Sequence, residues 1–181
     1  MPIRIEKTFQ VEEPVSPVWG LLSDPKRVAA CVPGASITEQ VDDKTYRGTI
    51  RVKVGPSATD YKGELQIVRL DAENHEIEII GKGQDVKGRG SASMKMTAKA
   101  RSLESGGTEV TSVAEVNVVG ILAQMGARVI QEVSNVIFAQ FVKNFQMQLR
   151  TPSDAAPTQA KPLSAASVAW AAAKGALHRN S

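Results

Sequence analysis

Strand-like alternation of apolar and polar residues, followed by one long apolar stripe, constrains the fold of this chain more than any other feature. The alternating segments are residues 3–11, 44–54, 61–70, 76–80, 88–103 and 109–119. Such alternation is typical of an antiparallel sheet with one buried face, in which sequential strands are neighbours. The stripe covers residues 121–149, which would form a helix about 43 Å long. The sequence therefore predicts an α+β fold, with a curved antiparallel sheet of about six to seven strands around a long C-terminal helix.

Two short helices are expected after the first strand. The first begins at Pro14 and carries an apolar stripe that includes Val18 and Trp19. A second covers residues 26–31, between an Asp-Pro and a Pro-Gly dipeptide, and such dipeptides commonly bound short helices. These helices would connect the first strand to the rest of the sheet.

The chain divides into three parts by composition. Residues 1–150 carry all the strand and helix patterns above and are long enough to bury a core, so they are expected to form one domain. Residues 151–162 contain three prolines and no apolar periodicity, which is typical of a flexible linker. Residues 163–181 form a short amphipathic segment that is too short to span a bilayer.

The C-terminal segment has three open interpretations. Its candidate contact residues are Leu163, Trp170, Lys174, Leu177 and Arg179. An apolar stripe flanked by basic residues suits a membrane interface. The same stripe suits a groove on a partner protein, and an alanine-rich end can also have no binding role.

Charge and composition exclude several classes of protein. The net charge is only +3 and aromatic residues make up 4% of the chain, which disfavours a nucleic-acid-binding protein. Cys31 is the single cysteine, so no intrachain disulfide can form. Without a signal peptide or a run of about 20 apolar residues, we expect a cytoplasmic protein with no membrane-spanning helix.

Residues able to carry out chemistry are scarce. His75 and His178 have no second ligand at metal-binding spacing, so no metal site is expected. Cys31 lies in a short apolar helix, which favours a buried, unreactive thiol over a nucleophile. The glycines of residues 81–90 lack the strand–loop–helix context of a phosphate-binding loop and indicate a hairpin connection.

Inward-facing polar residues are equally few. Only Tyr46, Arg69 and Tyr61 fall on the inward side of the alternation, and no acid–base pair points inward. We therefore expect no catalytic residues and no enzymatic activity.

The inward face of the sheet and the helix stripe form the candidate ligand cavity. It comprises Ile50, Val52, Leu65, Ile67, Ile79, Met94, Met96, Val116, Leu122, Met125, Val129, Val133, Ile137 and Phe138. A filled core would give the same pattern. The adaptable methionines and the lack of aromatic fillers on the strands are instead features of a permissive apolar pocket.

Four segments resemble the family of the G subunit of carbon monoxide dehydrogenase. They are PVSPVWGLLSDPKRVAACVPG at 14–34, YRGTIRVKVGPSATDYKGELQIVRLD at 46–71, GKGQDVKGRGSASM at 81–94, and VVGILAQMGARVIQEVSNVIFAQFVKNF at 118–145. The resemblance extends over residues 1 to about 150. It implies the START-like, helix-grip fold, whose members enclose apolar ligands.

The resemblance also implies a function. Members of the family accompany molybdenum-containing CO dehydrogenases and related hydroxylases, and are implicated in linking them to the membrane and its quinone pool. The expected role is a non-catalytic carrier of an isoprenoid quinone or lipid, in the cytoplasm and peripherally attached to the inner face of the cytoplasmic membrane. No covalently bound cofactor is expected. The alternatives are an assembly or docking factor for that dehydrogenase with no small-molecule ligand, and a cyclase-like enzyme of the same fold.

Overall fold

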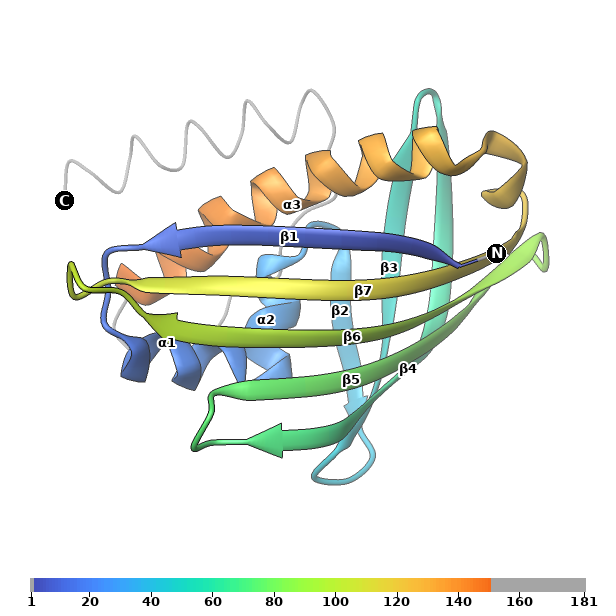
Figure 1. Ribbon diagram of the computed structural model, residues 1–181. Coiled ribbons are helices and arrows are strands. Elements are labelled where there is room, and N and C mark those ends of the chain that lie inside the picture. The colour runs from blue at the N-terminus through green and yellow to red at the C-terminus, as the bar shows by residue number, and fades with distance from the viewer. Residues whose placement is uncertain (1, 151–181) are drawn as a thin grey trace, which may run out of the picture.

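A computed structural model describes residues 2–150 of the chain, which form one antiparallel sheet and its covering helices (Figure 1). The strands are β1 Ile3–Val11, β2 Ala35–Gln40, β3 Thr45–Val54, β4 Ser57–Asp71, β5 Glu76–Asp85, β6 Gly90–Ser102 and β7 Thr108–Gly120. The helices are α1 Val15–Leu22, α2 Pro25–Cys31, the 3₁₀ turn η1 Ala123–Met125 and α3 Ala127–Arg150. The predicted α+β helix-grip architecture is confirmed.

The sheet order is β1-β7-β6-β5-β4-β3-β2. Strands β2 to β7 form a meander, as predicted, because each pairs with its neighbour in sequence. For the first strand the expected sequential order is wrong, because β1 pairs with β7 instead of β2: Ile3 lies opposite Val116 and Val11 opposite Thr108. The segment containing α1 and α2 therefore carries the chain from one edge of the sheet to the other.

Glycines on three adjacent strands mark a sharp bend in the sheet. Gly48, Gly63 and Gly83 are direct cross-strand neighbours on β3, β4 and β5. A Cβ atom on Gly63 would lie 2.0 Å from the Lys82 carbonyl oxygen, and one on Gly48 would lie 2.4 Å from that of Ser36. Such close backbone approach requires glycine. In Figure 1, β3 consequently runs nearly upright while β1, β7 and β6 run across the view.

The hydrophobic core lies at one end of the sheet. There α1, α2 and the C-terminal half of α3 cover the end of β1 and the start of β7, so that Phe145, Val18 and Leu21 are fully buried. Asp24 caps α2 by accepting hydrogen bonds from the backbone N–H groups of Lys26 at 3.1 Å and Arg27 at 3.4 Å. The two short helices are present as predicted, and they close this end of the molecule.

Helix α3 makes its main packing contacts with α2 and β1 rather than with the middle of the sheet. Phe9 of β1 meets Phe141 and Phe145 edge-on, with ring centroids 6.2 and 5.3 Å apart. Lys7 of β1 donates a hydrogen bond to the Asn135 side chain of the helix. The helix is thus attached along one edge strand and crosses the sheet obliquely (Figure 1).

The long helix was expected to begin at residue 121, but α3 begins only at Ala127. Residues before Ala127 form the 3₁₀ turn η1, and Gly126 separates that turn from α3 with φ +86° and ψ 159°. That conformation is essentially restricted to glycine. Leu122 and Met125 stay in phase with the apolar stripe, which is why the pattern continues across the break.

Three further details differ from the expected elements. The short edge strand β2 was not located, and β5 continues through part of the glycine-rich segment to Asp85. A β-bulge at Val68 shifts the register, so that Arg69 pairs with Glu78. Arg69 therefore lies on the outer face among Asp71, Glu76 and Glu78, within 4 Å of each, and its inward assignment was wrong.

Candidate ligand-binding cavity

The inner face of the sheet is only partly covered at the end away from the core. At that end Ile50 and Val116 from the sheet and Val129 and Val133 from α3 are half-buried. Gly63 and Gly81 contribute no side chains to the surface between them. Because α3 packs mainly against β1 and α2, it does not bury these apolar residues completely. An apolar surface remains accessible beneath the first half of the helix.

A pocket of about 220 Å³ opens between α3 and β3 at this end. It is lined by Pro33, Arg51, Val52, Lys53, Gly55, Glu132, Val133, Val136 and Ile137. Valine and isoleucine side chains form its apolar wall, and the charged residues lie at its rim. Val136 remains 57% exposed on the helix side. The pocket is therefore an apolar opening that leads toward the inner face.

The fourteen candidate cavity residues fall into three groups. Ile67 and Ile79 are buried in the core, and Leu65, Met94 and Met96 pack against it. Val52, Val133 and Ile137 line the pocket. The others are half-buried: Ile50, Val116, Leu122, Met125, Val129 and Phe138. The tail candidates Leu163, Trp170, Lys174, Leu177 and Arg179 lie outside the described residues.

An ion pair between the buried Asp85 and the partly exposed Arg89 closes the far end of β5, and the sequence pattern did not single it out. The Asp85 side chain has no exposed surface and lies 2.6 Å from Nε of Arg89. Its carboxylate also accepts hydrogen bonds from the backbone N–H groups of Lys87 and Arg89. These interactions hold the turn between β5 and β6. An Asp followed four residues later by Arg in a glycine-rich turn is too common a pattern to reveal this.

This ion pair predicts a specific pH dependence of stability. The hydrogen bond from Arg89 holds the pKa of Asp85 below its ordinary value of 3.8. A lowered folded-state pKa means that the carboxylate stabilises the fold at neutral pH, and that this contribution is lost as pH falls below about 4. Asp85→Asn should thus be less stable than wild type at pH 7, and the difference should shrink towards pH 2. Urea unfolding at several pH values measures it, and a pH-independent difference would contradict the assignment.

The single cysteine is fully buried in α2. Its thiol donates to the Arg27 carbonyl oxygen at 3.4 Å, and burial raises the pKa of Cys31 to about 12. The thiolate is the reactive form, so the folded protein should not react with a disulfide reagent such as dithionitrobenzoate at pH 8. Reaction should become rapid in denaturing urea. Stoichiometric labelling of the native protein within minutes would show that α2 opens readily.

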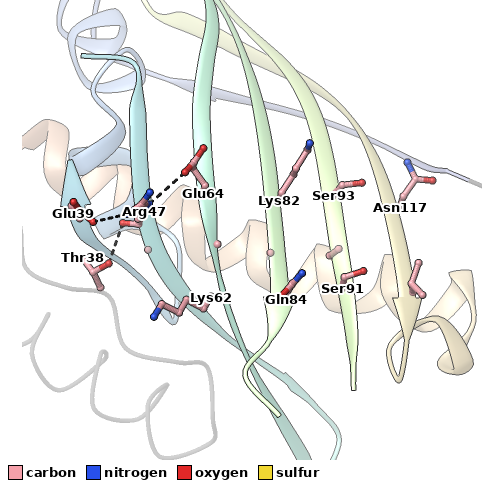
Figure 2. A pocket seen from close by; sticks show the side chains of 15 residues that line it. Thr38, Glu39, Arg47, Lys62, Glu64, Lys82, Gln84, Ser91, Ser93 and Asn117 are labelled. Atoms are coloured by element: carbon pink, nitrogen blue, oxygen red, sulfur yellow. Dashed lines mark hydrogen bonds and ion pairs between the residues drawn. The ribbon is translucent and has the colours of Figure 1, made fainter. Parts of the chain in front are cut away.

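A second, larger hollow lies on the face of the sheet that points away from α3 (Figure 2). Its volume is about 720 Å³, and Lys62, Lys82, Gln84, Ser91, Ser93 and Asn117 contribute to its lining. Arg47 lies between Glu39 and Glu64, at 3.2 and 3.5 Å. This polar, open surface is unsuited to an apolar ligand. The pocket beside α3 is the smaller of the two but has the matching chemistry.

The part of the chain that the structure describes holds neither a metal-ion cluster nor a helix able to cross a membrane. Residues 2–150 do not bring three histidine, cysteine or carboxylate groups together in a way that could hold a metal ion. Within the same range, no helix has both the length and the apolar character needed to cross a bilayer.

Known structures define the class of protein to which this arrangement belongs. A crystal structure of a conserved protein from Geobacillus kaustophilus is similar with a TM-score of 0.74 and 17% identity, over 82% of this chain and 95% of that one. A START superfamily protein from Mycobacterium smegmatis gives 0.58 and 10%, over 82% and 97%. The Zhui aromatase/cyclase from Streptomyces sp. R1128 gives 0.54 and 14%, over 82% and 92%. The chain therefore has the START-like helix-grip fold.

The family follows from the sequence itself. The family model for CoxG, the G subunit of carbon monoxide dehydrogenase, matches residues 8–150. The chain belongs to this family, as its motifs indicated. No curated protein matches the sequence. Family and fold together point to a ligand-binding or carrier role.

Proposed function

We propose that this protein is a non-catalytic carrier that holds an isoprenoid quinone or a similar lipid between its sheet and α3. The observation that carries the proposal is the uneven filling of the interior. One end is a packed core, while the other presents half-buried apolar side chains beside an open pocket. A protein that used its interior for stability alone would bury both ends.

Apolar contact alone can retain such a ligand. Burial of one five-carbon prenyl unit contributes about 4 kcal/mol, at about 0.8 kcal/mol per CH₂-sized group. Several units would exceed the cost of immobilising the ligand. The pocket is too small for a whole prenylated molecule, so the ligand would extend from it along the inner face under α3.

The absence of catalysis is part of the proposal. Most side chains of the inner face are apolar, and glycines leave other positions bare. The charged groups there already have partners, since Lys7 bonds Asn135 and Asp85 bonds Arg89. Arg51, Lys53 and Glu132 line the pocket beside α3. Chemistry on a bound ligand would need an acid or base placed within hydrogen-bond reach of it. A carrier needs none.

The wider role that we propose follows the family. The protein would serve a molybdenum-containing CO dehydrogenase or a related hydroxylase and exchange its ligand at the inner face of the cytoplasmic membrane. Residues 163–181 would supply the membrane or partner contact through their apolar stripe and basic residues.

Native mass spectrometry combined with organic extraction tests the proposal. The full chain, purified from lysate that contains membranes, should carry a stoichiometric quinone or lipid. Incubation of stripped protein with quinone-containing vesicles should restore the adduct. A mass that stays at the value of the bare chain in both cases would overturn the carrier function and favour a docking factor for the dehydrogenase.

A further inference from the structure

The hydroxyl group of Tyr61 is a buried polar atom on the inner face of β4. Tyr61 is only 4% exposed, yet its hydroxyl oxygen has no hydrogen-bond partner. No other buried side-chain oxygen or nitrogen within the described part of the chain lacks one. Buried hydroxyls nearly always find a partner, because desolvation without one is costly. An exception of this kind on the inner face, beside residues that line the candidate cavity, points to a ligand group as the missing partner.

Tyr61 lies at the incompletely filled end of the inner face. It shares that face of β4 with Gly63 and Leu65, and pairs with Ile50 of β3. The Tyr61 side chain lies beside Gly83 of β5, within ordinary van der Waals distance of a Cβ placed there. Tyr61 is not part of the main core cluster. Val52, which lines the pocket beside α3, is the next inward residue of β3 after Ile50.

The ion pair beside Tyr61 cannot take up the hydroxyl. Each oxygen of Asp85 already accepts two hydrogen bonds: Oδ1 from the Lys87 backbone N–H and Nη2 of Arg89, and Oδ2 from the backbone N–H and Nε of Arg89. Burial and the adjacent Asp85 charge raise the pKa of Tyr61, so the hydroxyl stays protonated and can donate. Arg89 is engaged by Asp85 and does not attract a second anion. A neutral acceptor suits this position better than a carboxylate or phosphate.

We infer that the Tyr61 hydroxyl donates a hydrogen bond to a carbonyl oxygen of the carried ligand and so fixes its polar end at this place in the cavity. This inference rests on the carrier function proposed above. A quinone ring and an uncharged glycerolipid ester share this carbonyl chemistry. The apolar remainder would lie along the half-buried residues beneath α3, towards the pocket.

Tyr61→Phe tests the inference because it removes one oxygen atom and keeps the ring. The probes are a benzoquinone with a short prenyl chain, a diacylglycerol, and a prenylated benzene without carbonyl groups. We expect about tenfold weaker binding of the carbonyl probe that is the true ligand type, which corresponds to one neutral hydrogen bond. The prenylated benzene should bind wild type and variant equally. Which of the two carbonyl probes loses affinity distinguishes a quinone site from a lipid site.

Infrared spectroscopy supplies an independent readout. The carbonyl stretch of the bound probe should shift to lower frequency in wild type and lose that shift in Tyr61→Phe. Tyr46→Phe is the matched control, since the Tyr46 hydroxyl already accepts a hydrogen bond from Gln40 at 3.5 Å. It should change neither affinity nor spectrum.

The outcomes separate the two proposals. If wild type binds none of the probes, the carrier function fails and this inference fails with it. If wild type binds and Tyr61→Phe binds every probe equally well, the carrier function stands and the Tyr61 assignment is overturned. Equal weakening for all probes would also overturn it, because the effect would then be steric. Thermal unfolding of Tyr61→Phe should match or exceed wild type, which shows that the fold is intact.

Discussion

Replacing Met94 by lysine is expected to reduce the affinity for a prenylated quinone by about a hundredfold. Met94 lies on the inner face of β6, with its methyl group 3.6 Å from the position of a Cβ on Gly81. A lysine there would have to lose its hydration when an apolar ligand enters, at a cost of about 3 kcal/mol or more. Isothermal titration calorimetry of the purified variant with a short-chain quinone measures the loss of affinity.

The neighbouring residue provides a matched control. Ser93 is adjacent in sequence, but its side chain faces the outer hollow on the opposite side of β6 (Figure 2). Ser93→Lys adds the same charge to the same strand and should leave affinity within about twofold of wild type, because an exposed ammonium stays hydrated. If the two variants bind the quinone equally well, the ligand does not occupy the inner face.

The largest effect on stability is expected for Gly63→Ala, which should lose about 3 kcal/mol or more, or fail to fold. The added methyl carbon would lie 2.0 Å from the Lys82 carbonyl oxygen and 2.8 Å from the Gly83 Cα atom. Both are backbone atoms in the neighbouring strand, so no side-chain rotation relieves the clash. Urea unfolding followed by far-ultraviolet circular dichroism gives the free energy of unfolding.

Gly20→Ala is the opposite case and serves as the control. Gly20 lies within α1, and nothing lies within 4 Å of an added Cβ. Alanine in a helix should raise stability by about 0.5–1 kcal/mol, since glycine loses more backbone entropy on folding. An unchanged urea midpoint for Gly63→Ala would mean that the three glycines do not enforce the bend of the sheet.

The sequence was informative wherever one buried face sets the spacing of apolar residues along a strand or helix. The alternation of β1, β3 and β7 and the stripe of α3 each reflect that constraint, so fold class and inward face followed from them. Local backbone geometry was not predictable in the same way. The bulge at Val68 moved Arg69 to the outside, and Gly126 broke the helix without disturbing its apolar phase. The alternation of apolar and polar residues does not reveal where a β-bulge shifts the register between two strands.

The candidate cavity was predictable in kind but not in extent. An apolar residue at an inward position indicates the inner face. It does not tell whether other side chains of the protein pack against that residue. Ile79 and Ile50 are the same residue type on the same face, yet the first is buried under the core and the second is half-buried. The difference arises from the placement of α3 on β1 and α2, a tertiary contact. Asp85 was missed for the same reason, since its burial depends on how the β5–β6 turn folds back.

The pairing of β1 with β7 has a consequence for how the chain is made. Strand β1 leaves the ribosome before the other strands of this sheet, but Val116, which lies opposite Ile3, is synthesised more than a hundred residues later. Until then Ile3, Ile5 and Phe9 have no strand to pair with, while strands β2 to β6 can already pair with their neighbours in sequence. Long-range closure of this kind slows folding and leaves an unpaired edge exposed. In a newly synthesised chain, β1 must therefore pair with β7 before a strand of another chain pairs with that exposed edge.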